Sequence, residues 1–334
     1  MTDEYTEITV VGEDSEGLIA RVTSLLFERG CNIEDLDQDV RQGVFRMTMH
    51  VDTAGMVTTE ATLREDLAEL GEDLGLDVQV RFPSEQAGRR VAVMVTKESH
   101  CLERLLEAFE TDELDAELAA VVGNHDDLHP LVEASELDVP FYDAGDASGK
   151  LDEEWLLDIL DEEDVDTVAL ARFMRILSPD VVFRYDNRII NVHPSLLPSF
   201  PGASAYRQAV EKGARIAGVT AHYVTTDLDQ GPIIAQRAFS VPDSVYRQEE
   251  GQTADPEDAA EELREIGQPL ESEALVEALK LHLNGDSLVR NDRTELREGA
   301  ADYQLGLDPE ADDALPTEPV DRHDEIVPAE SAND

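Results

Sequence analysis

The sequence predicts an α/β protein made of two units with different topologies. Residues 1–82 follow the order strand, helix, strand, strand, helix, strand, or βαββαβ. From residue 89 onward, short apolar strands alternate with helical patterns, which indicates a doubly wound, mostly parallel sheet. Residues 83–88 contain Pro, Ser and Gly and are expected to link the units, and the second unit is expected to end at residue 297. Residues 298–334 are acidic and poor in aromatics, which predicts a disordered tail.

Hydrophobic spacing predicts the elements of the first unit. Residues 5–12 alternate as a strand, and the apolar residues of the next segment, including Leu18 and Val22, recur at helical spacing until Gly30. The remaining elements are strands at 32–41 and 43–52 joined by the hairpin pair Gln42-Gly43, a helix at 58–74 and a strand at 77–82.

The second unit reads as strands separated by helices. Short apolar strands are expected at 91–95, 116–122, 139–142, 167–171 and 188–192. Helical patterns lie between or after them at 100–110, 126–135, 152–162 and 204–213. A long helix at 256–283 is expected to close the unit. Gly267 and Pro269 leave open whether the helix is broken near these residues. In such sheets ligands bind beyond the carboxyl ends of the strands.

The acidic composition indicates the salt conditions to which the protein is adapted and the partners that it disfavours. The formal net charge is −50, from 76 acidic and 26 basic side chains. Repulsion between exposed charges is screened at molar salt, where the Debye length is about 3 Å, so we interpret the acidity as adaptation to the cytoplasm of a halophile. Nucleic-acid binding is disfavoured because it needs a basic surface.

Other features of the composition favour a cytoplasmic protein. The start Met1-Thr-Asp-Glu-Tyr5 lacks the basic and apolar regions of a signal peptide, and no run of about 18 apolar residues predicts a membrane span. The cysteines Cys31 and Cys101 fit a reducing compartment. We interpret Cys101 as a buried structural residue, and the polar run 125–129 as a loop in place of a metal site.

The predicted strand ending near residue 192 carries side chains suited to acyl chemistry. Asn191 and His193 are two residues apart and therefore share one face of a strand. An Asn amide can stabilise a developing oxyanion, and a His can exchange a proton near neutral pH. Asp229 lies in a later loop closed by Gly231-Pro232, and the sequence alone does not bring it to His193. A satisfied polar pair at a strand end is the structural alternative.

Two strings resemble the signatures of formyltransferases that use 10-formyltetrahydrofolate. They are Asn191-Val-His-Pro-Ser-Leu-Leu-Pro198 and Asp229-Gln-Gly-Pro-Ile-Ile234. The resemblance implies a formyltransferase-type, Rossmann-like unit in which Asn191, His193 and Asp229 are catalytic. His222 is assigned a supporting role beside them. The string Phe173-Met-Arg-Ile-Leu177 also resembles the family. In relatives the backbone at the positions of Met174 to Leu177 contacts the pterin ring, so Met174, Arg175, Ile176 and Leu177 are expected to bind substrate.

The first unit resembles the ACT regulatory domain, a ferredoxin-like fold. The resemblance rests on the βαββαβ order, Asp14-x-x-Gly17 and Asn32-Ile33. It implies homo-oligomerisation through paired ACT domains and, often, an amino-acid effector such as glycine or methionine near Asp14, Gly17 and Asn32. A role in assembly alone is the alternative.

Further motifs are similar to those of formyltetrahydrofolate deformylases. They are Val95-Thr-Lys-Glu-Ser-His-Cys-Leu102 and Val122-Gly-Asn-His-Asp126, behind an ACT unit. Phosphoribosylglycinamide formyltransferases instead have a glycine-rich loop after the first strand, where backbone N–H groups hold a phosphate. This chain has no glycine there, and Glu98 would face the phosphate. One departure is Pro194, where deformylases usually have a second His.

The resemblance implies hydrolysis of 10-formyltetrahydrofolate to formate and tetrahydrofolate, which would balance one-carbon pools and supply formate for purine synthesis. The expected mechanism needs no metal and no tightly bound cofactor. Asn191 and protonated His193 would stabilise the oxyanion, and Asp229 would orient His193 and position or deprotonate water. Two alternatives remain: a phosphoribosylglycinamide formyltransferase, and a non-catalytic folate- or amino-acid-sensing ACT protein.

Overall fold

A computed structural model describes residues 5–82, 89–146, 148–246, 255–290, 293–297 and 300. The predicted linker at 83–88 and, apart from Ala300, the predicted tail at 298–334 lie outside these residues. None of the helices within the described ranges is long and apolar enough to cross a membrane.

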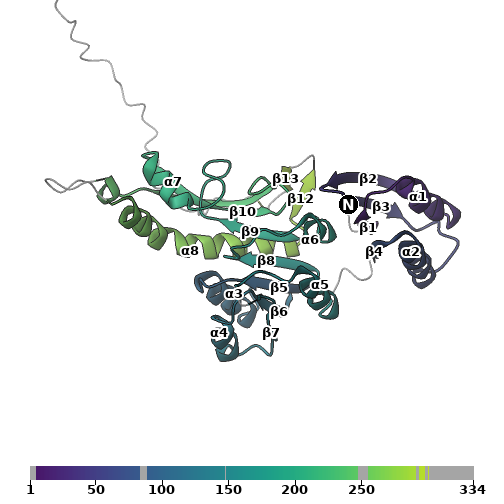
Figure 1. Ribbon diagram of the computed structural model, residues 1–334, viewed down its shortest axis with the longest axis horizontal. Coiled ribbons are helices and arrows are strands. Elements are labelled where there is room, and N and C mark those ends of the chain that lie inside the picture. Colours follow the sequence, from purple (N-terminus) through teal and green to yellow (C-terminus); the bar gives the residue numbers. More distant parts are fainter. Residues whose placement is uncertain are drawn as a thin grey trace, which may run out of the picture.

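The N-terminal unit is a four-stranded antiparallel sheet with two helices on one face (Figure 1). Its strands have the order β2-β3-β1-β4. This confirms the predicted βαββαβ order. The elements are β1 (Thr6–Glu13), α1 (Leu18–Glu28), β2 (Asn32–Arg41), β3 (Val44–Asp52), α2 (Glu60–Leu74) and β4 (Leu76–Arg81).

Local residues set the turns and helix ends of this unit. Gln42 and Gly43 both have positive φ, 53° and 86°, as a two-residue type I′ hairpin requires. The Thr59 side chain accepts a hydrogen bond from the Thr62 backbone N–H at the start of α2, and Gly75 ends that helix in the left-handed conformation.

The second unit contains a seven-stranded sheet with the order β11-β10-β9-β8-β5-β6-β7. The pairs from β7 to β9 are parallel, whereas β10 and β11 are antiparallel additions at one edge. Its strands are β5 (Arg90–Val95), β6 (Glu117–Gly123), β7 (Phe141–Asp143), β8 (Thr167–Ala171), β9 (Ile189–His193), β10 (Ile216–Tyr223) and β11 (Ile233–Ser240). A mostly parallel α/β unit is therefore confirmed.

Helices cover both faces of this sheet (Figure 1). Helices α3 and α8 pack on one face and α5 and α6 on the other, each through a separate apolar cluster. The chain runs outward from β5 to β7 and then crosses to β8 and β9, so a topological switch point lies between β5 and β8. The helices are α3 (His100–Glu110), α4 (His129–Ala134), α5 (Glu153–Glu162), α6 (Pro179–Arg184), α7 (Ala205–Glu211), the 3₁₀ helix η2 (Asp243–Tyr246) and α8 (Pro256–Leu283).

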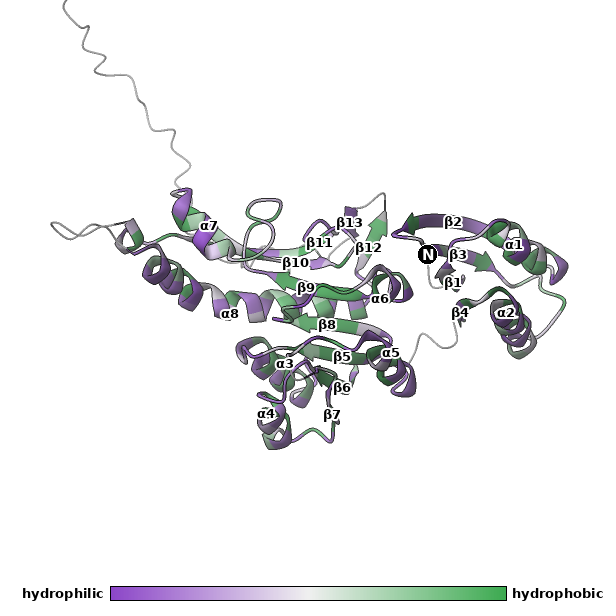
Figure 2. Cartoon of the chain, viewed as in Figure 1, coloured by the Kyte–Doolittle hydropathy of each residue, from purple (hydrophilic) through white to green (hydrophobic). Residues whose placement is uncertain are grey.

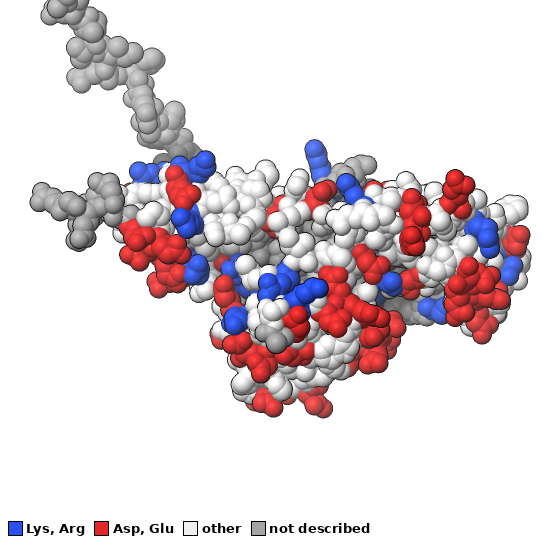
Figure 3. Space-filling view, viewed as in Figure 1, with Lys and Arg blue, Asp and Glu red and all other residues white. Residues whose placement is uncertain are grey.

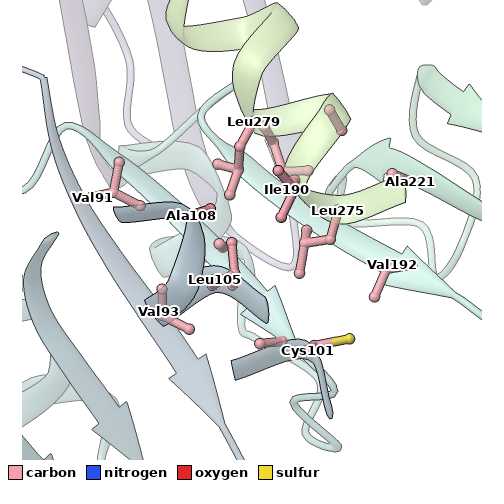
Figure 4. Close-up of a cluster of buried hydrophobic side chains, with 14 of the residues drawn as sticks. Val91, Val93, Cys101, Leu105, Ala108, Ile190, Val192, Ala221, Leu275 and Leu279 are labelled. Atoms are coloured by element: carbon pink, nitrogen blue, oxygen red, sulfur yellow. The ribbon is translucent and has the colours of Figure 1, made fainter. Parts of the chain in front are cut away.

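The strands of the large sheet form the apolar centre of the molecule. Figure 2 shows apolar residues along β5, β8 and β9, and hydrophilic residues on the outer helices. In Figure 4, Val93 of β5, Ile190 of β9 and Leu279 of α8 belong to one cluster of buried side chains. Cys101 lies in the same cluster with no exposed surface, and burial raises the pKa of its thiol. This environment agrees with the structural interpretation of Cys101.

Helix α8 is continuous, so the break considered near Gly267 and Pro269 is absent. An interior proline removes one backbone hydrogen bond and costs about 3 kcal/mol. Buried residues on both sides of Pro269, among them Leu263 and Leu275, hold the helix against the sheet and compensate for that loss.

Several described elements are absent from the predicted set. They are α6, the edge strands β10 and β11, η2 and the hairpin of β12 (Ser287–Arg290) with β13 (Arg293–Leu296). β10 is the one that matters most for the site, because it pairs with β9.

The free face of the ACT sheet packs against α6 of the second unit. Ion pairs cross this contact between Arg46 and Asp186 and between Arg184 and Asp77. The Arg46 guanidinium also lies 5.6 Å from the centre of the Phe183 ring. The ACT unit is thereby attached next to β8 and β9 (Figure 1).

The acidic side chains are distributed over much of the visible surface. Figure 3 shows them over the ACT helices and over the left-hand end of α8, while basic side chains gather over α7. This pattern fits the formal net charge of −50 and leaves the sheet core apolar.

A buried histidine generates a pH prediction for the fold. His282 on α8 contacts the hydroxyls of Thr167 (3.0 Å) and Tyr223 (2.9 Å). Burial, assisted by nearby Arg residues including Arg188, lowers the pKa of His282 from 6.5 to about 4. The unfolded chain therefore takes up this proton first as the pH falls. At about 1.36 kcal/mol per pKa unit, the protein should lose on the order of 3 kcal/mol of unfolding free energy between pH 6.5 and 4.

Urea unfolding of the wild type and of His282→Gln at fixed salt, at pH 7.5 and 4.5, measures this contribution. The variant should show a smaller loss of unfolding free energy between the two pH values. Equal losses would show that His282 does not carry the effect.

Candidate active site

Asn191 and His193 lie at the carboxyl end of β9, which is separated by β8 from the switch point of the sheet. The two side chains project on the same face of the strand, as their spacing predicts. Asn191 is partly buried, and the His193 side chain is 7% exposed. The carboxyl end of β9 therefore carries an amide and an imidazole on the same face.

The antiparallel partner β10 places a second imidazole on that face. His222 is directly opposite Asn191 in the register of β9 and β10. Its Nδ1 donates to the Tyr223 carbonyl at 2.8 Å, so its Nε2 can accept from the Asn191 amide at 3.2 Å. Burial lowers the pKa of His222, which favours the neutral ring that this pattern requires. His222 thus orients the Asn191 amide.

Asp229 reaches the same cluster from the loop after β10. The Gly231 Cα lies so close to the Tyr223 carbonyl oxygen that a Cβ would be 1.7 Å from it, which allows the loop to turn back sharply. Asp229 has a left-handed backbone, with φ 54°. Its Oδ2 accepts from the Gly202 N–H at 2.7 Å and lies 3.4 Å from His193 Nδ1, while its Oδ1 is 3.9 Å from His222 Nε2. The structure therefore brings together all four residues that the sequence analysis placed at the reacting centre.

The loop after β9 holds the His193 ring in place. His193 Nε2 lies 3.0 Å from the carbonyl oxygen of Phe200. The Thr220 hydroxyl, on β10, donates to the Ser195 carbonyl at 2.6 Å and accepts from the Leu197 N–H at 3.0 Å. The two ring nitrogens of His193 therefore lie near oxygens of Asp229 and Phe200, which fix the orientation of the ring.

A cavity of about 480 Å³ opens over these residues. Met174, Arg175, Ile176 and Leu177, predicted to bind substrate, all line it. Met174 and Ile176 are 54% and 76% exposed, which leaves apolar side chains available at the cavity wall. Their segment is anchored, because the Met174 N–H donates to the Thr96 hydroxyl at 3.0 Å and Arg175 Nε donates to the Gly149 carbonyl at 2.8 Å.

A larger cavity of about 980 Å³ lies between the ACT unit and the second unit. Arg64, Tyr185 and His282 are among the residues that line it, and it contains none of the predicted site residues. The smaller cavity, which combines titratable groups with an apolar wall, is the better candidate for an active site.

The predicted effector residues do not meet within one chain. The Asp14 N–H donates to the Gly43 carbonyl at one end of the β2–β3 hairpin, and Gly17 follows at the start of α1. Asn32 pairs with Asp52 at the opposite end of that hairpin. All three residues are exposed. An effector site that included Asp14 and Asn32 would need two chains.

Sequence reasoning did not identify two residues beside the cavity, Glu271 and Tyr206. Glu271 lies on α8 with no exposed surface, and it accepts a hydrogen bond of 2.6 Å from the Tyr206 hydroxyl. The available signal was an acidic residue within the apolar stripe of a long helix, between Gly267 and Ala274. An acid at such a position is rare unless it is paired.

Comparisons with known proteins identify the families that the two units match. Residues 89–279 match the family model described as formyl transferase, and residues 4–81 match the ACT domain model. A formyltetrahydrofolate deformylase of Bacillus subtilis is 37% identical over 286 residues, covering 84% of this chain and 90% of that protein. The crystal structure of a formyltetrahydrofolate deformylase from Pseudomonas syringae is 30% identical with a TM-score of 0.56, covering 87% of this chain and 94% of that one.

Similarity to phosphoribosylglycinamide formyltransferases covers less of the chain. The structure of that enzyme from Anaplasma phagocytophilum is 32% identical with a TM-score of 0.54, covering 64% of this chain and 96% of that one. The deformylase relatives, in contrast, match over both units. The chain therefore belongs to the formyltetrahydrofolate deformylase family.

Proposed function

We propose that this protein hydrolyses 10-formyltetrahydrofolate to formate and tetrahydrofolate, acting on a C–N bond of the formyl amide. The observation that carries the proposal is the cluster of Asn191, His193 and Asp229 at one cavity of about 480 Å³. Membership of the deformylase family supplies the substrate class. The formate released would feed purine synthesis and balance one-carbon pools, and no tightly bound cofactor takes part.

Each residue of the cluster has a distinct role in the proposed reaction. The Asn191 amide and protonated His193 stabilise the formyl oxygen as it becomes an oxyanion. Asp229 stabilises protonated His193 and takes a proton from the attacking water. The new bond joins the water oxygen to the formyl carbon. The bond from that carbon to N10 of the folate then breaks, and N10 takes up the proton. The pterin ring lies against the segment Met174–Leu177.

The Asp229 role leads to a matched pair of variants. Asp229→Asn keeps the size of the side chain but removes its base, so formate release should fall by at least about 100-fold while folate binding stays within a few-fold. Asp227→Asn, in the same loop with a 56% exposed side chain, is the control and should behave as wild type. Formate release and folate titration measure the two effects. Activity retained in Asp229→Asn would remove Asp229 from this role.

Water as the formyl acceptor is tested by one assay with two arms. Formate release from 10-formyltetrahydrofolate is followed with and without glycinamide ribonucleotide. Release that does not depend on the added amine supports hydrolysis. Turnover that strictly requires the amine would instead identify a phosphoribosylglycinamide formyltransferase, and the absence of both reactions would favour a sensor.

The same assay examines the proposed halophilic adaptation. The net charge of −50 is screened at molar KCl, where the Debye length is about 3 Å. Activity should therefore be higher and longer-lived in about 2 M KCl than in about 0.1 M KCl. Equal activity and lifetime in both would count against adaptation to high salt.

For the ACT unit, we propose pairing between chains and an amino-acid effector at the paired surface. Support comes from the separation of Asp14 and Asn32 in one chain, which pairing would overcome. The hairpin also lies close to the loop that carries Asp229, because Arg41 is 3.6 Å from Asp227.

Calorimetry with glycine and methionine tests the effector. We expect saturable heat with one of them, and its loss in Asn32→Ala because the paired surface then lacks an amide. Silence with all common amino acids would leave the ACT unit as an assembly module.

A further inference from the structure

A largely buried ion network lies against the cavity. Glu271 of α8 has no exposed surface, and its Oε2 lies 3.2 Å from His100 Nε2 and 3.3 Å from Arg172 Nε. Arg172 also makes a two-pronged contact with Glu98, with distances of 3.0 Å from Nη2 and 3.1 Å from Nε. The Arg172 guanidinium therefore forms ion pairs with two carboxylates.

The network occupies the switch point of the sheet. Glu98 follows β5, Arg172 follows β8, and both line the cavity together with Tyr206. In doubly wound sheets this is where ligands bind. Here the cavity wall at this place carries Arg172, which is already paired with Glu98 and Glu271.

Helix α8 is shaped to reach this network. The Tyr206 hydroxyl donates to Glu271 Oε1 at 2.6 Å, and its ring passes directly over Gly267. A Cβ on Gly267 would lie 1.8 Å from the Tyr206 hydroxyl oxygen. The absence of a side chain at Gly267 therefore allows Tyr206 to reach Glu271. Tyr206 then bonds to Oε1 while His100 and Arg172 contact Oε2, so both oxygens of the buried carboxylate have partners.

The network also fixes the predicted folate segment. Arg172 has φ 59°, a left-handed conformation that is unfavourable for a residue with a side chain, and Met174–Leu177 follows it. The contacts of Arg172 with Glu98 and Glu271 hold it in that conformation. Burial works against ionisation of Glu98, but the hydrogen bond and charge of Arg172 outweigh it and lower the pKa of Glu98.

A metal site is the competing interpretation of this cluster. His100, Cys101 and Glu271 have potential ligand atoms within 4.8 Å of one another. A divalent cation there would lie against the Arg172 guanidinium, which already supplies positive charge to Glu271. Burial also raises the pKa of the Cys101 thiol, which disfavours the thiolate that a metal would need. The geometry fits an ion network better.

We propose that Glu98, Arg172 and Glu271 form a specificity element that closes the cavity to phosphorylated amine acceptors and leaves water as the acceptor. A phosphate needs free cations or N–H donors, whereas Arg172 is shared by two carboxylates and Glu98 presents negative charge. This inference rests on the proposed hydrolysis and names the residues that select its acceptor.

The two outcomes differ in which bond forms at the formyl carbon. In hydrolysis that carbon bonds to the water oxygen. In transfer it bonds to the amine nitrogen, the bond to N10 breaks, and one amine proton passes to N10. The ratio of formylated amine to formate therefore reports acceptor choice independently of the total rate.

The test measures this ratio with 10-formyltetrahydrofolate and glycinamide ribonucleotide. Glu98→Gln removes charge at the cavity wall and releases Arg172 from one partner, so the ratio should rise at least 10-fold over wild type. Glu271→Gln should raise it too and should increase the KM for folate more than it lowers kcat, because the folate segment loses its anchor. Glu273→Gln, at a 53% exposed position two residues along α8, is the control and should match wild type.

Thermal melts of each variant show whether it is folded. Should Glu271→Gln unfold, Glu98→Gln still decides, since Glu98 lies at the cavity wall with its side chain 36% exposed. A folded Glu98→Gln that gives formate alone would overturn the inference. Absence of formate release by the wild type would refute the proposed hydrolysis itself.

Discussion

The register between β9 and β10 is the constraint on which the site depends. It places His222 opposite Asn191 and Thr220 opposite His193. His222 orients the amide, and Thr220 ties down the loop whose Phe200 carbonyl holds the His193 ring. A slip of one residue would turn the His222 and Thr220 side chains to the other face of the sheet, where neither could make these contacts.

Two residues at the proposed active site have unfavourable backbone conformations. Asp229 and Arg172 both have left-handed backbones, and each is held by contacts from distant parts of the chain. The Gly202 amide fixes Asp229, and Glu271 fixes Arg172. Such backbones cost of order 1–3 kcal/mol each and persist only where surrounding structure imposes them. The apolar core formed by α3, α8 and the sheet supplies that rigid surrounding.

Two kinds of charge serve different purposes in this molecule. Exposed acidic side chains give the large net charge, and salt screens the repulsion between them. Buried ions such as Glu271 and Arg172 are paired at close range and are screened much less. Salt therefore affects the exposed charges more than the ion network beside the cavity. The ion pairs between the ACT sheet and the α6 region are partly buried, so salt also screens them less than it screens exposed charges.

The sequence by itself determined both folding classes, the hairpin at Gln42-Gly43 and the shared face of Asn191 and His193, because these follow from local spacing and turn chemistry. It also pointed to Asp229 and to the segment 174–177 through resemblance. Only the tertiary structure showed that Asp229 lies beside His193 and that Glu271 belongs to a buried ion network. The physical reason is distance along the chain. The pairing of β10, the closure of the loop and the ion contacts join residues that are far apart in the sequence, and local periodicity carries no information about them. The continuity of α8 through Pro269 likewise depends on packing against the sheet.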